Sequence, residues 1–142
     1  MSLHARSIYH LVTASELRAG VAGRVYRPLS LESEGFVHCS LERAVLAVAD
    51  DYFAEAGEPL IVLAIDPTRL SAEVRYEAPA PIAGGGTQHL QEAPVFPHVY
   101  GPIDLDSVSG AGVLEPSGEG YAWPRQLVKL DELLVRPVAG RS

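Results

Sequence analysis

Short runs of apolar, β-branched and aromatic residues recur along the chain and predict a protein rich in strands. These runs are "SIYHLVT", "GFVHCS", "PLIVLAID", "AEVRYE", "VFPHVYGPI", "LDSVSGAGVLEP" and "GEGYAWP". "PLIVLAID", residues 59–66, is nearly unbroken in apolar side chains, as expected for a central strand that is covered on both faces. The pattern therefore predicts a sheet with this strand inside it.

Helical spacing is clearest in residues 41–57, where apolar side chains recur every three or four positions and a glycine ends the run. Ser40, directly before this run, is expected to cap the helix. Thr13 and Glu16 form the capping-box pattern of a short helix after the first strand. An amphipathic pattern in residues 125–135 indicates a further helix in the tail.

Two stretches predict connections without regular structure. Residues 21–35 hold a proline, two serines and glycines, and we expect an ordered loop there. Residues 78–94 read "APAPIAGGGTQHLQEAP", and their three successive glycines predict a mobile segment from 83 to 93. The lysine and the following hydroxyl residue of a phosphate-binding P-loop are missing from "GGGTQH", so we do not interpret it as a nucleotide loop.

Composition limits the class of protein. At 142 residues the chain fits one domain, residues 1–142, and its formal net charge of −7 argues against nucleic acid as a partner. We expect no membrane association and a cytoplasmic location, because no signal peptide or long apolar run is evident. Cys39 is the single cysteine, which excludes an internal disulfide. The oligomeric state stays open.

Three histidines within predicted strands suggest chemistry. Residues two apart in a strand share a face, so His10 lies with Ile8 and Val12, His38 with Phe36 and Ser40, and His98 with Phe96 and Tyr100. A core histidine that donates to a backbone carbonyl would explain any one of them. Three on strands that can be neighbours favour a shared site, because imidazole exchanges protons near neutral pH. We therefore predict one concave surface lined by the three rings, with Ser40 and Tyr100 beside them.

Three kinds of site fit these residues. The three imidazoles could hold a catalytic zinc ion, although no closely spaced histidine pair prepares such a site. Cys39 could be a nucleophile with a histidine as base, but strand alternation turns it away from His38, which favours a small buried apolar role. The third option, a cleft for a small-molecule ligand, uses the hydroxyl groups of Ser30, Ser40 and Tyr100.

Charged residues near the second histidine add to the third option. Arg27 could neutralise a pyrophosphate, whereas Arg24 is better explained as part of a solvated loop. Glu34 adjoins "GFVHCS" and is either a general base or a surface carboxylate that caps a turn.

Five segments together resemble a widespread bacterial family that is catalogued as domain of unknown function 952. The segments are "IYHLVT", "YRPLSLESEGFVHCS", "LIVLAIDPTRL", "VRYE" and "FPHVYGPIDLDSV". The resemblance covers residues 7–124 and leaves 125–142 as a C-terminal extension. It implies an α+β domain similar to the ADP-ribosyltransferase fold, with a split, mixed β-sheet, flanking helices and a cleft for NAD.

The same resemblance implies roles for the histidines. His10 matches a position that contacts ribose, and His38 matches a histidine version of a second motif position. "FPHVYG" lacks the catalytic glutamate of the third position. The resemblance therefore implies that the cleft binds NAD, ADP-ribose or a related phosphorylated ribose. We expect no metal. His10 would hold the ribose hydroxyls, Ser40 would order the ligand, and His38 would move a proton in transfer at the anomeric carbon. A non-catalytic ligand or protein-interaction module and a histidine-metal hydrolase remain the alternatives.

Overall fold

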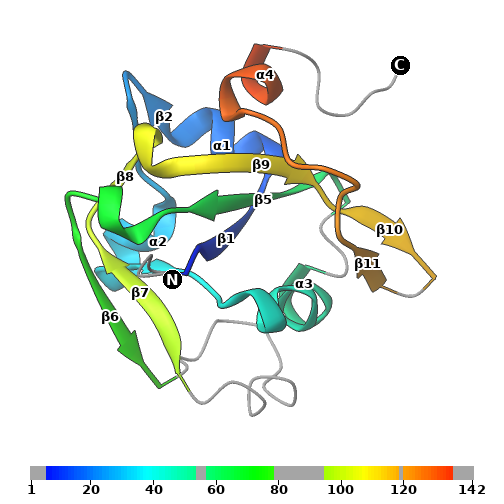
Figure 1. Cartoon of the computed structure of the whole chain (residues 1–142), viewed down its shortest axis with the longest axis horizontal. Coiled ribbons are helices and arrows are strands. Elements are labelled where there is room, and N and C mark those ends of the chain that lie inside the picture. Colours follow the sequence, from blue (N-terminus) through cyan, green and yellow to red (C-terminus); the bar gives the residue numbers. More distant parts are fainter. Residues whose placement is uncertain (1–5, 54–56, 79–94, 119, 136–142) are drawn as a thin grey trace.

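A three-stranded antiparallel sheet runs through the middle of the protein, with β5 (Leu60–Ile65) between β1 (Ile8–Thr13) and β9 (Val108–Val113) (Figure 1). The structure, a computed structural model, describes residues 6–53, 57–78, 95–118 and 120–135. Every residue of β5 is buried. Alternate side chains enter two apolar clusters, Ile61 in one and Val62 in the other. The prediction of a central strand covered on both faces is confirmed.

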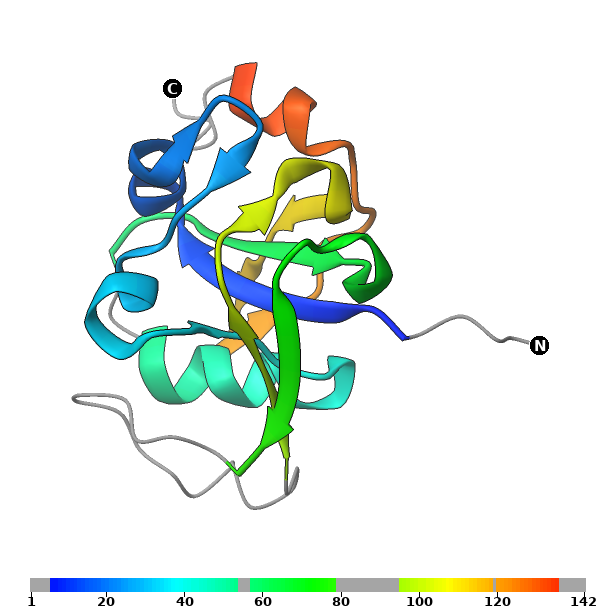
Figure 2. The same ribbon diagram turned by 90° about the vertical axis from the view of Figure 1, so that its left-hand side faces the viewer.

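A second sheet carries two of the histidines. Its strand order is β4 (Val37–His38), β7 (Phe96–Tyr100) and β6 (Glu73–Glu77). Figure 2 shows β6 and β7 crossing β1 and β5 steeply. Beyond β4 the chain turns toward β1, and Tyr9 and Ser40 exchange two backbone hydrogen bonds of 2.8 and 2.7 Å. This bridge connects the two sheets at the point where the histidines lie.

The remaining strands form small ladders. They are β2 (Val21–Ala22), β3 (Val25–Tyr26) and β8 (Ile103–Asp104) in one sheet, and β10 (Glu115–Ser117) with β11 (Gly120–Ala122) in another. Every ladder in the described residues is antiparallel. The α+β class is therefore confirmed, but the expected mixed sheet is wrong. A short turn joins β2 to β3, and such a turn allows only antiparallel pairing.

The helices are short. They are α1 (Ala14–Gly20), α2 (Leu29–Glu34), α3 (Val45–Phe53) and α4 (Leu130–Val135). The capping prediction for α1 is confirmed, because the Thr13 hydroxyl accepts from the Glu16 amide at 3.4 Å. The prediction that Ser40 caps the next helix is wrong. A 3-10 turn, Glu42–Ala44, precedes α3, and the Ser40 backbone is held instead by the bridge to β1.

The prediction of an irregular loop over residues 21–35 is also wrong, because β2, β3 and α2 lie there. The strands are two residues each and pair with β8, a partner far along the chain that local sequence does not reveal. The local signals of α2 were overlooked. Pro28 stands at its N-cap, and Gly35 ends it in the left-handed conformation, with φ of 87°.

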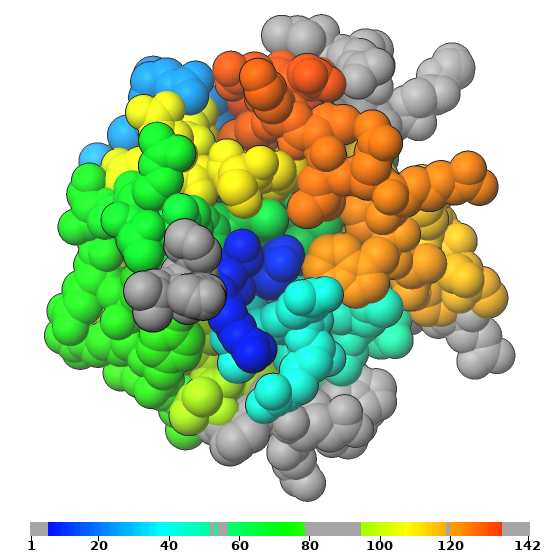
Figure 3. Space-filling model, viewed as in Figure 1, coloured from blue at the N-terminus to red at the C-terminus, as the bar shows by residue number. Residues whose placement is uncertain are grey.

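The C-terminal segment belongs to the folded body. Val128 bridges to Ala111 of β9, and Leu130, at 5% exposure, joins the main apolar cluster. Figure 3 shows this segment, orange to red, packed along β9. The predicted tail helix exists, although α4 begins only at Leu130. None of the helices in the described ranges is long and apolar enough to span a bilayer. The segment 83–93, predicted to be mobile, lies outside those ranges.

Candidate functional site

One pocket of about 410 Å³ is lined by His10, His38 and His98. Strand register brings them together. His38 of β4 pairs directly with His98 of β7, and the Tyr9–Ser40 bridge sets His10 of β1 beside β4. Ser40 also lines the pocket. The three imidazoles thus share one concave surface although they come from strands far apart in sequence.

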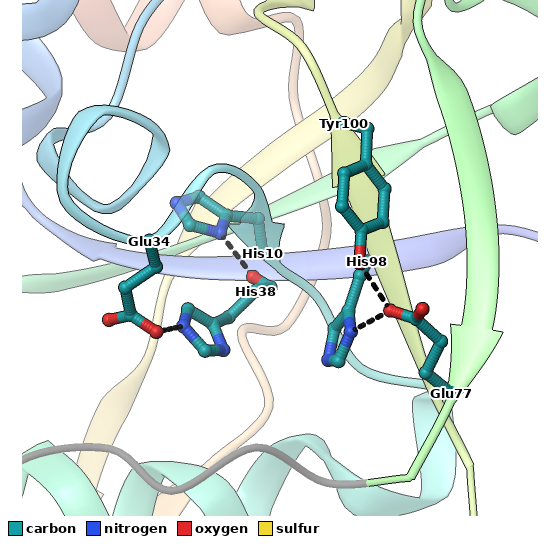
Figure 4. Close-up of polar contacts among 6 residues, drawn as sticks. All are labelled: His10, Glu34, His38, Glu77, His98 and Tyr100. Carbon is teal, nitrogen blue, oxygen red and sulfur yellow. Dashed lines mark hydrogen bonds and ion pairs between the residues drawn. The ribbon is translucent and has the colours of Figure 1, made fainter.

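His10 is a buried, neutral imidazole. Its Nδ1 lies 2.7 Å from the His38 carbonyl oxygen and must donate a proton to it, since a carbonyl only accepts (Figure 4). Desolvation lowers the pKa of His10 to about 4, even though the hydrogen bond to the His38 backbone acts in the opposite direction. Nε2 is then an acceptor, 3.4 Å from the Tyr26 hydroxyl. The histidine has the carbonyl partner of a core residue and also contributes an acceptor to the pocket.

His38 is oriented by a carboxylate. Its Nε2 lies 2.8 Å from Glu34 Oε1, and Glu34 is the last residue of α2 (Figure 4). When Nε2 carries the proton and donates it to Glu34, the lone pair of the neutral ring is on Nδ1. This is the arrangement in which a carboxylate holds one tautomer and supports the positive charge when Nδ1 takes up a proton. Glu34 is therefore the partner of a histidine, not the cap of a turn.

His98 has a more extensive support. Its Nδ1 lies 2.7 Å from Glu77 Oε1, and the Tyr100 hydroxyl donates to the same oxygen at 2.7 Å (Figure 4). These two bonds, Tyr100 first, lower the pKa of Glu77. The Arg75 guanidinium lies 4.4 Å above the Tyr100 ring centre. His98 is thus fixed by a carboxylate that its surroundings keep ionised.

The two imidazole–carboxylate pairs are close to each other. The ring centres of His38 and His98 are 5.7 Å apart in an edge-to-face arrangement. Phe36 stacks on His98 at 4.2 Å and contacts His38 at 4.8 Å. This aromatic packing limits the rotation of both rings, so the pair presents a defined geometry to the pocket.

The other predicted site residues divide between the pocket and the surface. Arg27 and Ser30 line the pocket, whereas Tyr100 lies outside its lining and reaches the site through Glu77. Arg24 pairs with two exposed aspartates, Asp106 at 2.9 Å and Asp131 at 3.4 Å, as a solvated loop residue does.

Cys39 is 3% exposed and belongs to the main apolar cluster. Burial raises the pKa of its thiol, which keeps the thiol protonated and unreactive. Its environment is that of a small apolar residue. As for metal ions, no group of three or more His, Cys, Asp or Glu side chains in the described ranges is arranged to hold one.

Sequence reasoning missed Glu77 and Tyr26. Glu77 could have been found by pairing "EVRYE" with "FPHVY" in an antiparallel hairpin, because that register sets Arg75 opposite His98 and Glu77 opposite Phe96 on one face. Tyr26 had no comparable signal. It sits in a stretch that we expected to be a loop, and β8 of distant sequence buries it to 1% exposure.

Comparisons with known proteins identify the family. A family model described as "Protein of unknown function (DUF952)" matches residues 11–111. The chain belongs to the DUF952 family. His38 and His98 lie within the matched range of this DUF952 protein, and His10 lies one residue before it.

Solved structures of protein CC0527 from Caulobacter crescentus share the fold. The crystal structure matches with a TM-score of 0.61 at 23% identity, covering 91% of this chain and 99% of that one. The solution NMR structure matches with a TM-score of 0.59 at 24% identity, covering 81% and 90%. At this identity the likeness concerns the fold alone. Among curated proteins, none matches this DUF952 chain.

Proposed function

We propose that the histidine-lined pocket binds NAD, ADP-ribose or a related phosphorylated ribose, and that His38 moves a proton in the reaction of that ligand. The observation that carries the proposal is the convergence of three imidazoles, Ser40 and Arg27 on one pocket of about 410 Å³. That volume is within the usual range for small-molecule sites. We take the ligand class from the resemblance to the ADP-ribosyltransferase fold that we infer from the sequence motifs.

The inner part of the pocket is suited to ribose hydroxyl groups. His10 Nε2 is an acceptor and the Tyr26 hydroxyl is a donor, 3.4 Å apart and both buried. A ribose diol has both donors and acceptors, so it can bond to each of them and to the Ser40 hydroxyl. Apolar side chains, including Leu11, Phe53 and Phe96, line the same pocket and suit the flat face of a base.

The charges in the lining limit how phosphate can bind. The lining holds one positive side chain, Arg27, and two carboxylates, Glu16 and Glu34, whose charges are of opposite sign. We assign the phosphate to the side of Arg27, where the guanidinium makes charge-assisted hydrogen bonds. A proton on His38 would offset the charge of Glu34 for an anionic ligand.

Transfer at the anomeric carbon is the reaction that the resemblance implies. Its transition state is cationic and is stabilised best by a carboxylate that faces the sugar. Glu34 and Glu77 each already hold an imidazole, at 2.8 and 2.7 Å, and Glu16, the other carboxylate of the lining, shares that lining with Arg27. Ligand binding with proton transfer by His38 is therefore the function that the geometry supports best, and transfer at the anomeric carbon is tested separately.

A thermal-shift titration with NAD, ADP-ribose and ribose 5-phosphate tests the ligand class. A ligand at a hundred times its dissociation constant stabilises the folded state by about 2.7 kcal/mol, which is a clear rise in melting temperature. We expect that rise for at least one ribose phosphate, and a smaller rise in the His10→Ala variant. Unchanged melting temperatures with all three compounds would contradict the proposal.

Chromatography of NAD incubated with the protein separates turnover from binding. Release of nicotinamide identifies reaction at the anomeric carbon. A rise in melting temperature without nicotinamide release excludes that reaction and leaves the binding proposal intact.

A further inference from the structure

Two imidazole–carboxylate pairs face one another across the β4–β7 ladder. Glu34 bonds His38 Nε2 and Glu77 bonds His98 Nδ1, so each ring has one nitrogen tied to a carboxylate. The second nitrogen of each ring, Nδ1 of His38 and Nε2 of His98, has no bonded partner among residues 6–53, 57–78, 95–118 and 120–135. With ring centres 5.7 Å apart, one small group in the pocket can contact both rings.

We propose that His38 and His98 form an acid–base pair that hydrolyses a ribose 2′,3′-cyclic phosphate carried on a small nucleotide. The proposal rests on the proposed function, since it assumes that the pocket accepts a phosphorylated ribose. It adds the reacting bond, which is a phosphorus–oxygen bond, and the second catalytic residue, His98.

The charges favour reaction at phosphorus. Attack on a phosphodiester adds negative charge to the phosphoryl oxygens, and imidazolium and guanidinium groups stabilise that charge. Both imidazoles and Arg27 line the pocket, and Glu34 and Glu77 are each bonded to one of the imidazoles. A cyclic phosphodiester also carries a single negative charge, which suits a pocket whose one lining arginine is accompanied by Glu16.

The step balances with water as the only co-reactant. The oxygen of water attacks phosphorus while the neutral imidazole of His38 takes a proton from it at Nδ1. The bond from phosphorus to one ribose oxygen breaks, and that oxygen takes a proton from Nε2 of the His98 imidazolium. The product is a ribose 2′- or 3′-monophosphate. Exchange with solvent then returns one proton to His98 and removes one from His38.

The solvent exposure of the two histidine side chains assigns the base and the acid. The His38 side chain is 19% exposed and meets solvent water, whereas that of His98 is 4% exposed and suits a leaving group enclosed in the pocket. Glu77 accepts from Tyr100 and faces Arg75, and both contacts favour its anionic form. An anionic Glu77 supports the imidazolium form of His98, which makes Glu77 a positioning residue for the acid.

The pH dependence follows from the groups around the two rings. His98 faces Glu77 and Arg75 of β6, Tyr100 of its own strand and His38 of β4. His38 faces Glu34 of α2 and, through its carbonyl, the neutral His10 of β1. Activity should fall at low pH as His38 becomes protonated and at high pH as His98 loses its proton, which gives a bell-shaped profile.

Phosphorus NMR of adenosine 2′,3′-cyclic phosphate incubated with the full chain tests the reaction. We expect conversion to a monophosphate, and a fall in kcat/KM of at least about 100-fold in both His38→Asn and His98→Asn. His38→Asn should lose the acidic limb of the profile and His98→Asn the alkaline limb. Ser109→Ala, an exposed change on β9, is the matched control and should keep the wild-type rate.

If the His98→Asn variant fails to fold, Glu77→Gln tests the acid role of His98 in its place. A neutral amide does not support the imidazolium, so the alkaline limb should move to lower pH, a change that loss of packing alone would not cause. Absence of product, or product formed by the two histidine variants at the wild-type rate, would overturn the proposal. Faster hydrolysis of an RNA oligonucleotide with a cyclic phosphate end would overturn the small-nucleotide assignment.

Binding measurements separate this proposal from the proposed function. If NAD or ADP-ribose raises the melting temperature while the cyclic phosphate is not hydrolysed, the acid–base pair is wrong and the ligand class stands. If the cyclic phosphate is hydrolysed while neither NAD nor ADP-ribose binds, the ligand class is too broad and the acid–base pair stands.

Discussion

His38 and His98 occupy directly opposed positions of the antiparallel β4–β7 ladder, and their ring centres are 5.7 Å apart. Opposed residues in such a ladder point to the same face. The pairing therefore fixes the two rings on one side of the sheet, where the main-chain bridge between Tyr9 and Ser40 adds His10. Backbone register, more than any local motif, builds the site.

Tyr26→Phe tests the ribose subsite. The change removes the hydroxyl that lies 3.4 Å from His10 Nε2 and leaves the buried ring in place. We expect a loss of about 1 kcal/mol in unfolding free energy and a similar loss in binding of ADP-ribose. Tyr121→Phe is the control, because its hydroxyl donates to the Phe53 carbonyl at 3.0 Å and Tyr121 does not line the pocket. Urea denaturation and calorimetric titration measure both effects. Equal losses of affinity in the two variants would show that the Tyr26 hydroxyl does not contact the ligand.

His10→Asn tests the neutral state of the first histidine. Its pKa is about 4 in the folded chain and 6.5 ordinarily, so between these values the unfolded chain binds a proton that the folded chain does not. The contribution of neutral His10 to the unfolding free energy should be fully present above pH 6.5. It should be lost as the pH is lowered toward 4, by about 3 kcal/mol in total. Asparagine keeps a donor for the His38 carbonyl and does not titrate. Denaturation series from pH 7.5 to 4.5 should show a shallower fall in the variant, and parallel curves would contradict the assignment.

The central strand, the α1 cap and the strand face on which each histidine lies could be predicted from the sequence, because these depend on short-range pattern. Alternation in "GFVHCS" and "VFPHVY" sets the face of each ring, and the continuous apolar run of β5 indicates its burial.

Partners distant in sequence explain the failures. Ser40 satisfies the local rule for a helix cap, but pairing with Tyr9 uses its backbone in a bridge. Tyr26 lies in a strand of two residues whose partner, β8, follows it by more than seventy positions. Glu77 becomes visible only after β6 and β7 are aligned. Such positions are decided by tertiary pairing, which one sequence does not display.

Glu77→Gln tests the carboxylate that fixes His98. The pKa of Glu77 lies below its ordinary value of 4.5 because of Tyr100 and His98, so the ionised form stabilises the folded chain. That contribution should be present above pH 4.5 and lost as the pH falls through the folded-state pKa. Urea denaturation between pH 6 and 3 should therefore show a smaller loss of stability for the variant. Glu115→Gln, an exposed change on β10, should follow the wild-type curve. A Glu77 variant that also follows it would show that the bonds contribute nothing to stability.

Gly35→Ala tests whether the left-handed backbone at the end of α2 is needed to hold Glu34 against His38. Gly35 has φ of +87°, and a Cβ there would meet open space, so the cost of alanine is backbone strain of about 1 kcal/mol without a clash. Gly118→Ala is a matched control, with φ of +59° and open space in the β10–β11 hairpin. Both variants should lose similar stability in urea.

The two glycine variants should differ in ligand binding. Relief of the strain at Gly35 turns the end of α2 and moves Glu34 away from the 2.8 Å contact with His38 Nε2. Affinity for ADP-ribose should then fall several-fold in Gly35→Ala and stay at the wild-type value in Gly118→Ala. Nitrogen NMR of labelled histidine should report a mixture of His38 tautomers in the first variant alone. If both variants bind alike and His38 keeps one tautomer, the carboxylate does not hold the ring, and the tautomer is set by the packing of Phe36 against it.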